Sequence, residues 1–186
     1  TRIGCETFGD LYNKRQALSI KVFFDKVKSI PYIEGNTGVE KDFLTAIKTL
    51  LVIAASKAVA QNTSVSRWDP TRLTIKGAFS KQALAVVWDF AEANPFSGGS
   101  AGWDISINWI LWFISSTSRI NSIGQTIQCS ATEKYLPVDS VSAFITDPPY
   151  FAAIPYADLS DFFYVWLKRA LKSEYPDLFN LSLTAK

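Results

Sequence analysis

The chain has 186 residues and a formal net charge of +2 at neutral pH, and 48% of its residues are hydrophobic while 19% are charged. This length suits one domain, or one and a fraction, with a sizeable core. The composition excludes an intrinsically disordered protein. The small net charge neither demands nor forbids a nucleic-acid partner, because acidic residues are interleaved with the basic ones along the sequence.

The residue types also limit the chemistry. Histidine is absent, and the two cysteines, Cys5 and Cys129, lie far apart. A zinc site, a Ser-His or Cys-His nucleophile pair and imidazole acid-base catalysis therefore lack the residues they require. We expect reduced thiols, no metal and a cytoplasmic protein, with a structural disulfide as the alternative. The chain begins at Thr1 with no signal-like segment, so we expect an internal fragment of a larger polypeptide.

The pattern of apolar residues divides the chain into a helical segment, residues 1–66, and an α/β segment, residues 67–186. In the first, an amphipathic helix is predicted from Gly9 to about Ile30 by four apolar residues at near-helical spacing: Leu11, Leu18, Val22 and Val27. Residues Lys41 to Ala60 are rich in alanine and contain no helix breaker, so they predict a second, more buried helix.

The middle of the chain is less regular. We expect a polar loop over residues 61–70 and a short strand at Arg72–Ile75. Residues Ala83–Phe90 are apolar enough for a buried strand or a helix, and periodicity does not separate the two. The glycine-rich residues Asn94–Gly102 predict a loop. A buried helix is expected from about Asp104 to Ser118, because its apolar run is too short and too interrupted to span a membrane.

The last third contains a strand-loop-helix pattern. Residues Gln125–Cys129 alternate as a strand does, and the apolar run Val141–Ile145 predicts a buried strand. Residues Asp158–Leu171 predict a helix with a broad apolar face, starting at Asp158 or Ser160. The residues directly after the second strand stand where open α/β sheets bind their ligands.

Those residues, Asp147-Pro148-Pro149-Tyr150, suit methyl transfer to an amino group. An exocyclic amino group is a poor nucleophile, because its lone pair is delocalised into the ring. The Asp147 carboxylate and the Pro148 carbonyl can accept both amino hydrogens and prepare the nitrogen to attack a sulfonium methyl group. Pro148 and Pro149 restrict the backbone so that these acceptors converge. Tyr150 offers a ring to stack on a base that has left the duplex. The alternative is a proline-stiffened turn.

Two blocks around this motif, Ile145–Phe151 and Pro155–Leu167, resemble a prokaryotic family of adenine-specific DNA methylases. These are large proteins, some of which carry a zinc-ribbon-like segment. The similarity covers Phe79–Lys186 well and the first two helices more loosely. It implies an α/β fold, with a partial Rossmann-like S-adenosylmethionine-dependent methyltransferase sheet and a helical N-terminal part. It also implies DNA as substrate, adenine favoured over cytosine, and marks Asp147, Pro148, Pro149 and Tyr150 as catalytic.

The resemblance leaves the methyl-donor site unassigned. Such enzymes hold the donor on an Asp-Pro-Phe-x-Gly-x-Gly type turn, which we expect upstream of this chain. The loop Asn94–Gly102 resembles that turn, and its glycines would let the backbone approach the donor at a helix start, but Asn94 stands where the acid is expected. Ser130 likewise stands where related enzymes often carry an acid near the adenine of the donor.

Two further groups of side chains have a structural interpretation beside a functional one. Asp158 and Asp161 would share a helix face, but acids near a helix start are also favoured by the helix dipole. Trp103, Trp109 and Trp112 could stack on bases, although the helical spacing of the last two predicts core positions.

We therefore expect that the intact protein methylates an exocyclic amino group in DNA and that this segment alone is inactive. The partners are DNA, with a base flipped into the site, and the remaining parts of a larger polypeptide, with no membrane. A non-catalytic helical module that positions DNA or binds another protein stays open. Methylation of RNA or of a protein amide stays open as well.

Overall fold

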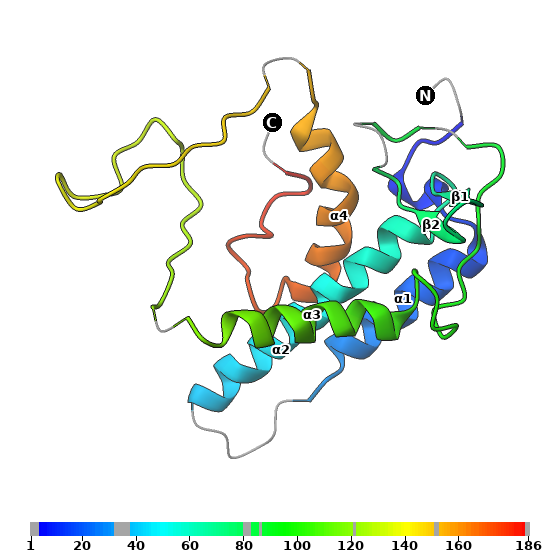
Figure 1. The fold of residues 1–186 in the computed structure, drawn as a ribbon, viewed down its shortest axis with the longest axis horizontal. Coiled ribbons are helices and arrows are strands. Elements are labelled where there is room, and N and C mark those ends of the chain that lie inside the picture. The colour runs from blue at the N-terminus through cyan, green and yellow to red at the C-terminus, as the bar shows by residue number, and fades with distance from the viewer. Residues whose placement is uncertain are drawn as a thin grey trace.

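A computed structural model describes residues 4–31, 38–79, 83–85, 87–120, 122–150 and 153–184. The elements in chain order are a 3-10 helix η1 (Phe8–Leu11), α1 (Lys14–Lys28), α2 (Gly38–Gln61), β1 (Arg67–Asp69), β2 (Thr74–Lys76), α3 (Trp103–Thr117) and α4 (Tyr156–Leu171). Helices α1, α2 and α4 pack on one another, and α3 contacts α2 (Figure 1).

Local signals determine where α1 begins and which side it buries. The Asn13 side chain accepts a hydrogen bond from the Gln16 backbone N–H at 2.9 Å, and Gln16 Oε1 accepts one from the Asn13 N–H at 2.9 Å. This reciprocal capping box satisfies amide groups that a helix start leaves without partners. The helix is amphipathic as predicted, but Ile20, Phe24 and Val27 form its buried side. Leu18 and Val22, which the spacing placed on that side, are 62% and 46% exposed.

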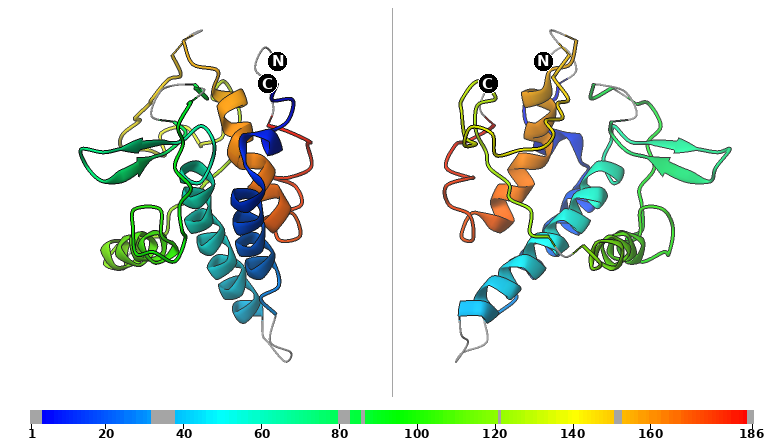
Figure 2. Two further views of the ribbon diagram at one scale, coloured as in Figure 1. Left: turned by 90° about the vertical axis from the view of Figure 1, so that its right-hand side faces the viewer. Right: turned by 60° about the vertical axis from the view of Figure 1, so that its left-hand side comes forward.

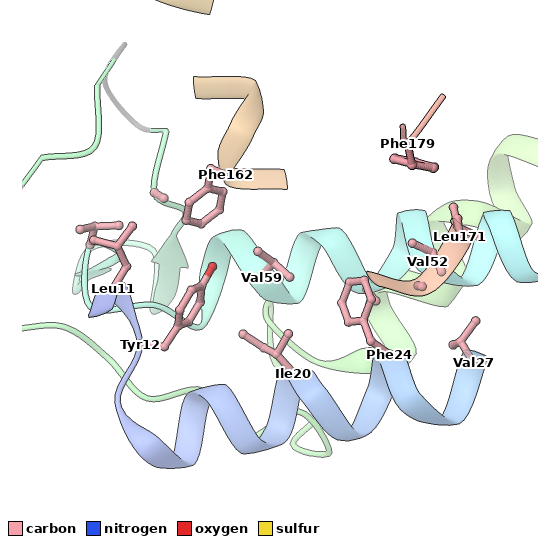
Figure 3. Packing of buried hydrophobic residues seen from close by; sticks show 14 residues of the cluster. Leu11, Tyr12, Ile20, Phe24, Val27, Val52, Val59, Phe162, Leu171 and Phe179 are labelled. Atoms are coloured by element: carbon pink, nitrogen blue, oxygen red, sulfur yellow. The ribbon is translucent and has the colours of Figure 1, made fainter. Parts of the chain in front are cut away.

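The core is organised around Phe162 of α4, which is fully buried. Its ring contacts Phe8, Tyr12 and Phe79, with centroid separations of 6.3, 6.2 and 5.2 Å. Figure 3 shows Phe162 and Tyr12 beside α2, with Ile20 pointing toward Val59. The core therefore contains residues from both sides of the division predicted at residue 66, and that division stays a prediction.

Helix α2 is the longest element among the described residues. Its stretch Lys41–Gln61 contains an 18-residue window with a mean hydropathy of 1.7, so it is long and apolar enough to cross a membrane by length and composition. The core helix of a soluble protein passes the same test, and α2 packs against α1, α3 and α4. The finding assigns no location in the cell.

A buried ion pair joins α2 to the turn after α4. Lys48 Nζ lies 3.3 Å from Glu174 Oε1, and both side chains are 4% exposed. Next to it, the Thr49 and Tyr175 hydroxyl oxygens lie 3.0 Å apart. Burial by itself raises the pKa of Glu174, but hydrogen bonds from Ser173 and Lys48 outweigh this effect and leave the pKa below its usual value.

The hairpin of β1 and β2 is the sole sheet within the described residues, and it projects from the helical body (Figure 2). The strands are antiparallel, with Trp68 opposite Ile75. The predicted loop over residues 61–70 missed β1, because a three-residue strand is defined by its partner and not by its own sequence. The strand predicted at Arg72–Ile75 forms two residues later, after Leu73 at φ 50°.

Other predicted strands are not formed in this structure. Residues 125–129 and 141–145 are exposed chain without strand pairing, and the described residues of 83–90 form neither strand nor helix. A strand needs the backbone of a neighbour for its hydrogen bonds. The described residues supply no such neighbour to 141–145. The structure neither shows nor excludes the partial Rossmann-like sheet, which stays a prediction.

Replacing Phe162 by alanine should destabilise the fold by about 3–5 kcal/mol, because it removes a ring with no exposed surface and leaves a cavity between three helices. Urea denaturation followed by circular dichroism measures this free energy. The matched control is Phe43→Ala in α2, whose ring is 65% exposed, and it should change the free energy by less than about 0.5 kcal/mol. Equal effects from the two variants would contradict this description of the core.

The Lys48–Glu174 pair should show strong coupling. Glu174→Gln leaves Lys48 buried without this carboxylate and should cost about 3–5 kcal/mol, whereas Lys48→Met/Glu174→Met together should cost much less.

The stability of the chain should also depend on pH through Glu174. Because the pKa of Glu174 is lowered in the folded state, its contribution to the free energy of unfolding is present above the unfolded pKa of about 4.3 and is lost as pH falls through the folded pKa. Urea denaturation between pH 3 and 7 should therefore show a steeper acid loss for the natural chain than for the double variant.

Candidate functional site

The motif Asp147-Pro148-Pro149-Tyr150 lies on an exposed segment that runs into α4. Figure 1 shows this segment in yellow, extending from the helical body before it enters the helix. All four motif residues are exposed. The Tyr150 N–H lies 3.5 Å from the Tyr156 hydroxyl, in the first turn of α4. Residues 151 and 152 lie outside the described part. Helix α4 therefore sets the position of the end of the motif.

The Asp147 carboxylate is open to solvent. Among the described residues it makes no hydrogen bond and no ion pair, so both oxygens can accept hydrogens from a substrate. Tyr150 is 63% exposed and can present its ring. The two acceptors and the ring are thus accessible to solvent.

The loop Asn94–Gly102 is held together by its own hydrogen bonds. Asn94 Oδ1 accepts from the Phe96 N–H at 3.0 Å, and the Pro95 carbonyl accepts from the Trp103 N–H at 2.8 Å. Gly98 has φ +66°, a conformation that favours glycine. Asn94 stands where the resemblance places the donor-binding acid. In this structure its side chain closes a turn within the loop.

The start of α3 carries a carboxylate of its own, that of Asp104. A Cβ on Gly102 would lie 2.5 Å from Asp104 Oδ1, so this carboxylate lies against the backbone at the helix N-terminus, where the dipole favours it. Ser100 Oγ also accepts a hydrogen bond from the Ile75 N–H at 3.2 Å.

The other position considered near the donor, Ser130, is exposed and pairs locally. Its hydroxyl oxygen lies 2.8 Å from that of Thr132. This contact stabilises a turn and indicates no ligand. Among the described residues, no group of three or more acidic or cysteine side chains is arranged to hold a metal ion.

Asp158 and Asp161 differ in their exposure. Asp161 is buried, and its Oδ1 accepts hydrogen bonds from the Thr184 N–H and hydroxyl, both at 2.7 Å. Asp158 is exposed. Asp161 therefore attaches the C-terminal segment to α4, a structural role that the sequence did not indicate. The helix begins at Tyr156 after Pro155, earlier than the predicted start.

The tryptophans of α3 differ in their surroundings. Trp103 stacks on Phe23 with a centroid separation of 4.7 Å. Trp109 and Trp112 are 59% and 63% exposed and meet edge to face at 5.9 Å. With Ile105 and Asn108 they line a shallow cleft of about 560 Å³. The prediction of core positions for Trp109 and Trp112 was wrong, because α3 is apolar on two sides and packs on α2 with one.

A second cavity, which the sequence did not indicate, lies beside the N-terminal segment. Its volume is about 540 Å³, and its lining is mostly apolar. The lining joins segments that are distant in sequence, including Cys5, Leu11, Val65, Leu84 and Leu183. No motif links these positions, so only the fold could have brought them together.

Comparisons with protein-family models, with curated proteins and with solved structures find no match to this chain. The resemblance to adenine-specific DNA methylases therefore stays a prediction that rests on the residues around Asp147.

Gly102→Ala should destabilise the chain by about 1–3 kcal/mol, because the new methyl group would lie 2.5 Å from Asp104 Oδ1 and 2.9 Å from the Gly99 carbonyl oxygen. Thermal unfolding followed by circular dichroism measures the loss. Gly124→Ala is the matched control, because a Cβ there meets nothing within 4 Å. A loss of stability no larger than that of Gly124→Ala would contradict the close packing described between Gly102, Asp104 and the Gly99 carbonyl.

Proposed function

We propose that this chain provides the target-base part of an S-adenosylmethionine-dependent methyltransferase that acts on an exocyclic amino group in DNA, adenine favoured over cytosine. The observation that carries this proposal is the Asp147–Tyr150 motif, exposed between the apolar run Val141–Ile145 and α4. The proposal also rests on the resemblance of the blocks on both sides of the motif to DNA methylases.

The proposed chemistry uses three groups of the motif. One Asp147 carboxylate oxygen accepts a hydrogen bond from one amino hydrogen, and the Pro148 carbonyl oxygen accepts one from the other. These bonds draw the nitrogen away from planarity and stabilise the positive charge that develops on it as it attacks the methyl group. The Tyr150 ring stacks on the flipped base. The donor would supply the methyl group when bound: the new nitrogen–carbon bond would form as the carbon–sulfur bond of the sulfonium breaks, the thioether would leave, and the nitrogen would give up one proton.

The proposed architecture places the remaining functions elsewhere. Residues 141–145 pair as a strand in a partial Rossmann-like sheet, and the donor is held by residues other than the Asn94–Gly102 loop. The open surroundings of Asp147 support this division. On this basis the isolated chain does not transfer methyl groups, and its partners are DNA and the parts of the protein that complete the sheet.

A second candidate function is a helical module that positions DNA or binds another protein without catalysis. The exposed apolar residues of α3, above all Trp109 and Trp112, favour it. The two candidates differ in whether Asp147 matters, because a binding surface on α3 needs no carboxylate at that position.

Asp147→Ala in the intact protein should lower methyl transfer to DNA by at least about 10²-fold, because it removes one of the two acceptors for the amino hydrogens. Transfer of a radiolabelled methyl group from S-adenosylmethionine measures this rate, with RNA and protein as parallel acceptors. The fold should be unaffected, because the carboxylate is exposed.

The matched control is Glu133→Ala, which removes another exposed carboxylate from the same segment. It should leave the transfer rate within about twofold. Undiminished transfer by the Asp147 variant would overturn the mechanism. Transfer to RNA or protein with none to DNA would overturn the substrate assignment.

A further inference from the structure

We infer that a basic stripe on α1 docks the phosphate backbone of duplex DNA. The stripe is defined by Lys14, Lys21 and Lys28 of α1 and is extended by Arg169 of α4. The inference deepens the proposed function, because it names a surface that holds DNA away from Asp147, and it rests on that function for DNA as the nucleic acid. It is carried by the distribution of charge, the spacing of the lysines and the packing of α1.

The positive charge of the chain is concentrated on α1. This helix contains five basic residues and one acidic residue, a net charge of +4, whereas the rest of the chain carries a net charge of −2. One of the five, Arg15, is paired with Glu92. The three lysines of the stripe and Arg169 are exposed. The small charge of the whole chain therefore understates the attraction that this helix offers to a polyanion.

The lysines of the stripe form one row along α1. Lys14, Lys21 and Lys28 are seven residues apart, which is close to two helical turns, so they lie on one side of the helix at intervals of about 10 Å. The row is thus about 21 Å long. Phosphates of one DNA strand follow one another every 3.4 Å or so along the axis, so the row spans roughly six base-pair steps. A straight row of cations fits a linear polyanion.

A single carboxylate lies beside this row, and it links the row to α4. Asp25 forms a partly exposed ion pair with Lys21. The hydrogen bond from Lys21 lowers the pKa of the Asp25 carboxyl, and the charges of Arg169 and Lys28 lower it further. One carboxylate thus meets three cations, which leaves an excess of positive charge. Because ion pairs at the surface contribute little, a phosphate can replace Asp25 as the partner of Lys21.

The packing of α1 favours DNA over an anionic membrane. A basic helix that lies in a membrane interface needs a free apolar face to insert. The apolar face of α1 holds Ile20, Phe24 and Val27, which are 1%, 1% and 6% exposed and point into the helical body (Figure 3). Leu18 and Val22 are exposed, but two side chains are a small part of such a face. The charges of the stripe are therefore available, whereas the surface that would enter lipid is buried.

Helix α4 connects the stripe to the candidate site. The Asp147–Tyr150 motif ends shortly before the first turn of α4, and Arg169 lies in the last turn. These two turns are about 20 Å apart along the helix axis, a distance that about six base pairs of a duplex cover. One duplex is therefore long enough to contact Arg169 while a base near the other end of α4 is flipped toward Asp147.

Fluorescence anisotropy with a fluorescein-labelled duplex of about 20 base pairs tests the inference in this chain. Lys14→Gln/Lys21→Gln/Lys28→Gln should weaken binding at least about tenfold at low salt, because three phosphate contacts are lost. It should also reduce the slope of log K against log salt concentration by about 2–3, since each contact contributes about 0.9. Arg169→Gln alone should reduce the slope by about 1.

The matched control is Lys41→Gln/Arg119→Gln/Lys134→Gln, which removes the same charge from exposed positions outside α1. It should change the affinity by less than about threefold, because these cations are not part of the row. Circular dichroism should show an unchanged fold for both triple variants, since all six side chains are exposed.

Equal weakening by the two triple variants, or no binding of DNA by the natural chain, would overturn the inference. Binding to vesicles of phosphatidylcholine and phosphatidylserine without binding to DNA would assign the stripe to lipid and overturn it as well. The proposed function is tested separately. DNA binding that depends on the stripe, in an intact protein that transfers no methyl group, would overturn the function and keep the docking. Methyl transfer with an unchanged KM for DNA in the stripe variant would overturn the docking alone.

Discussion

Burial of Phe162 is the interaction on which the arrangement of the chain depends. Its ring lies among Phe8, Tyr12 and Phe79, and this contact attaches α4 to the helices at the other end of the sequence. Because the Asp147 motif ends only a few residues before α4, the position of Phe162 also limits where the motif can lie. A stable helical body and the candidate site are therefore linked through one helix.

The helical body and residues 122–150 differ in how well their polar groups are paired and their apolar side chains are buried. In the body, the capping box of α1 and the Lys48–Glu174 pair give polar groups their partners. In residues 122–150, large apolar side chains such as Phe144, 79% exposed, face solvent. Burying one such side chain contributes about 1.5–3 kcal/mol. Covering the segment would therefore add more stability than a typical single interaction in the body.

Helices could be predicted from the sequence because their signals are local. Residues 41–60 and 158–171 contain the periodicity and composition that a helix needs, and α2 and α4 extend only a few residues beyond them. Local sequence patterns do not predict which segments pack against each other. They could therefore not predict the pairing of β1 with β2 or the surroundings of residues 141–145. Trp109 was misassigned for a similar reason, since spacing shows that a side is apolar but not what lies against it. The catalytic assignment of Asp147 came from chemistry and resemblance, and its exposure is what the structure adds.

The chemistry proposed for Asp147 and the apolar run before it both need surroundings that exclude water. In bulk water, a carboxylate and a carbonyl gain little by accepting amino hydrogens, because water offers the same hydrogen bonds. Their effect on the nitrogen becomes large where water is excluded and the acceptors are held in place. The apolar side chains up to Ile145 likewise need a surface that excludes water. Any surface that covers this run would begin to meet both needs, because it would bury the run and fix the residue that follows it.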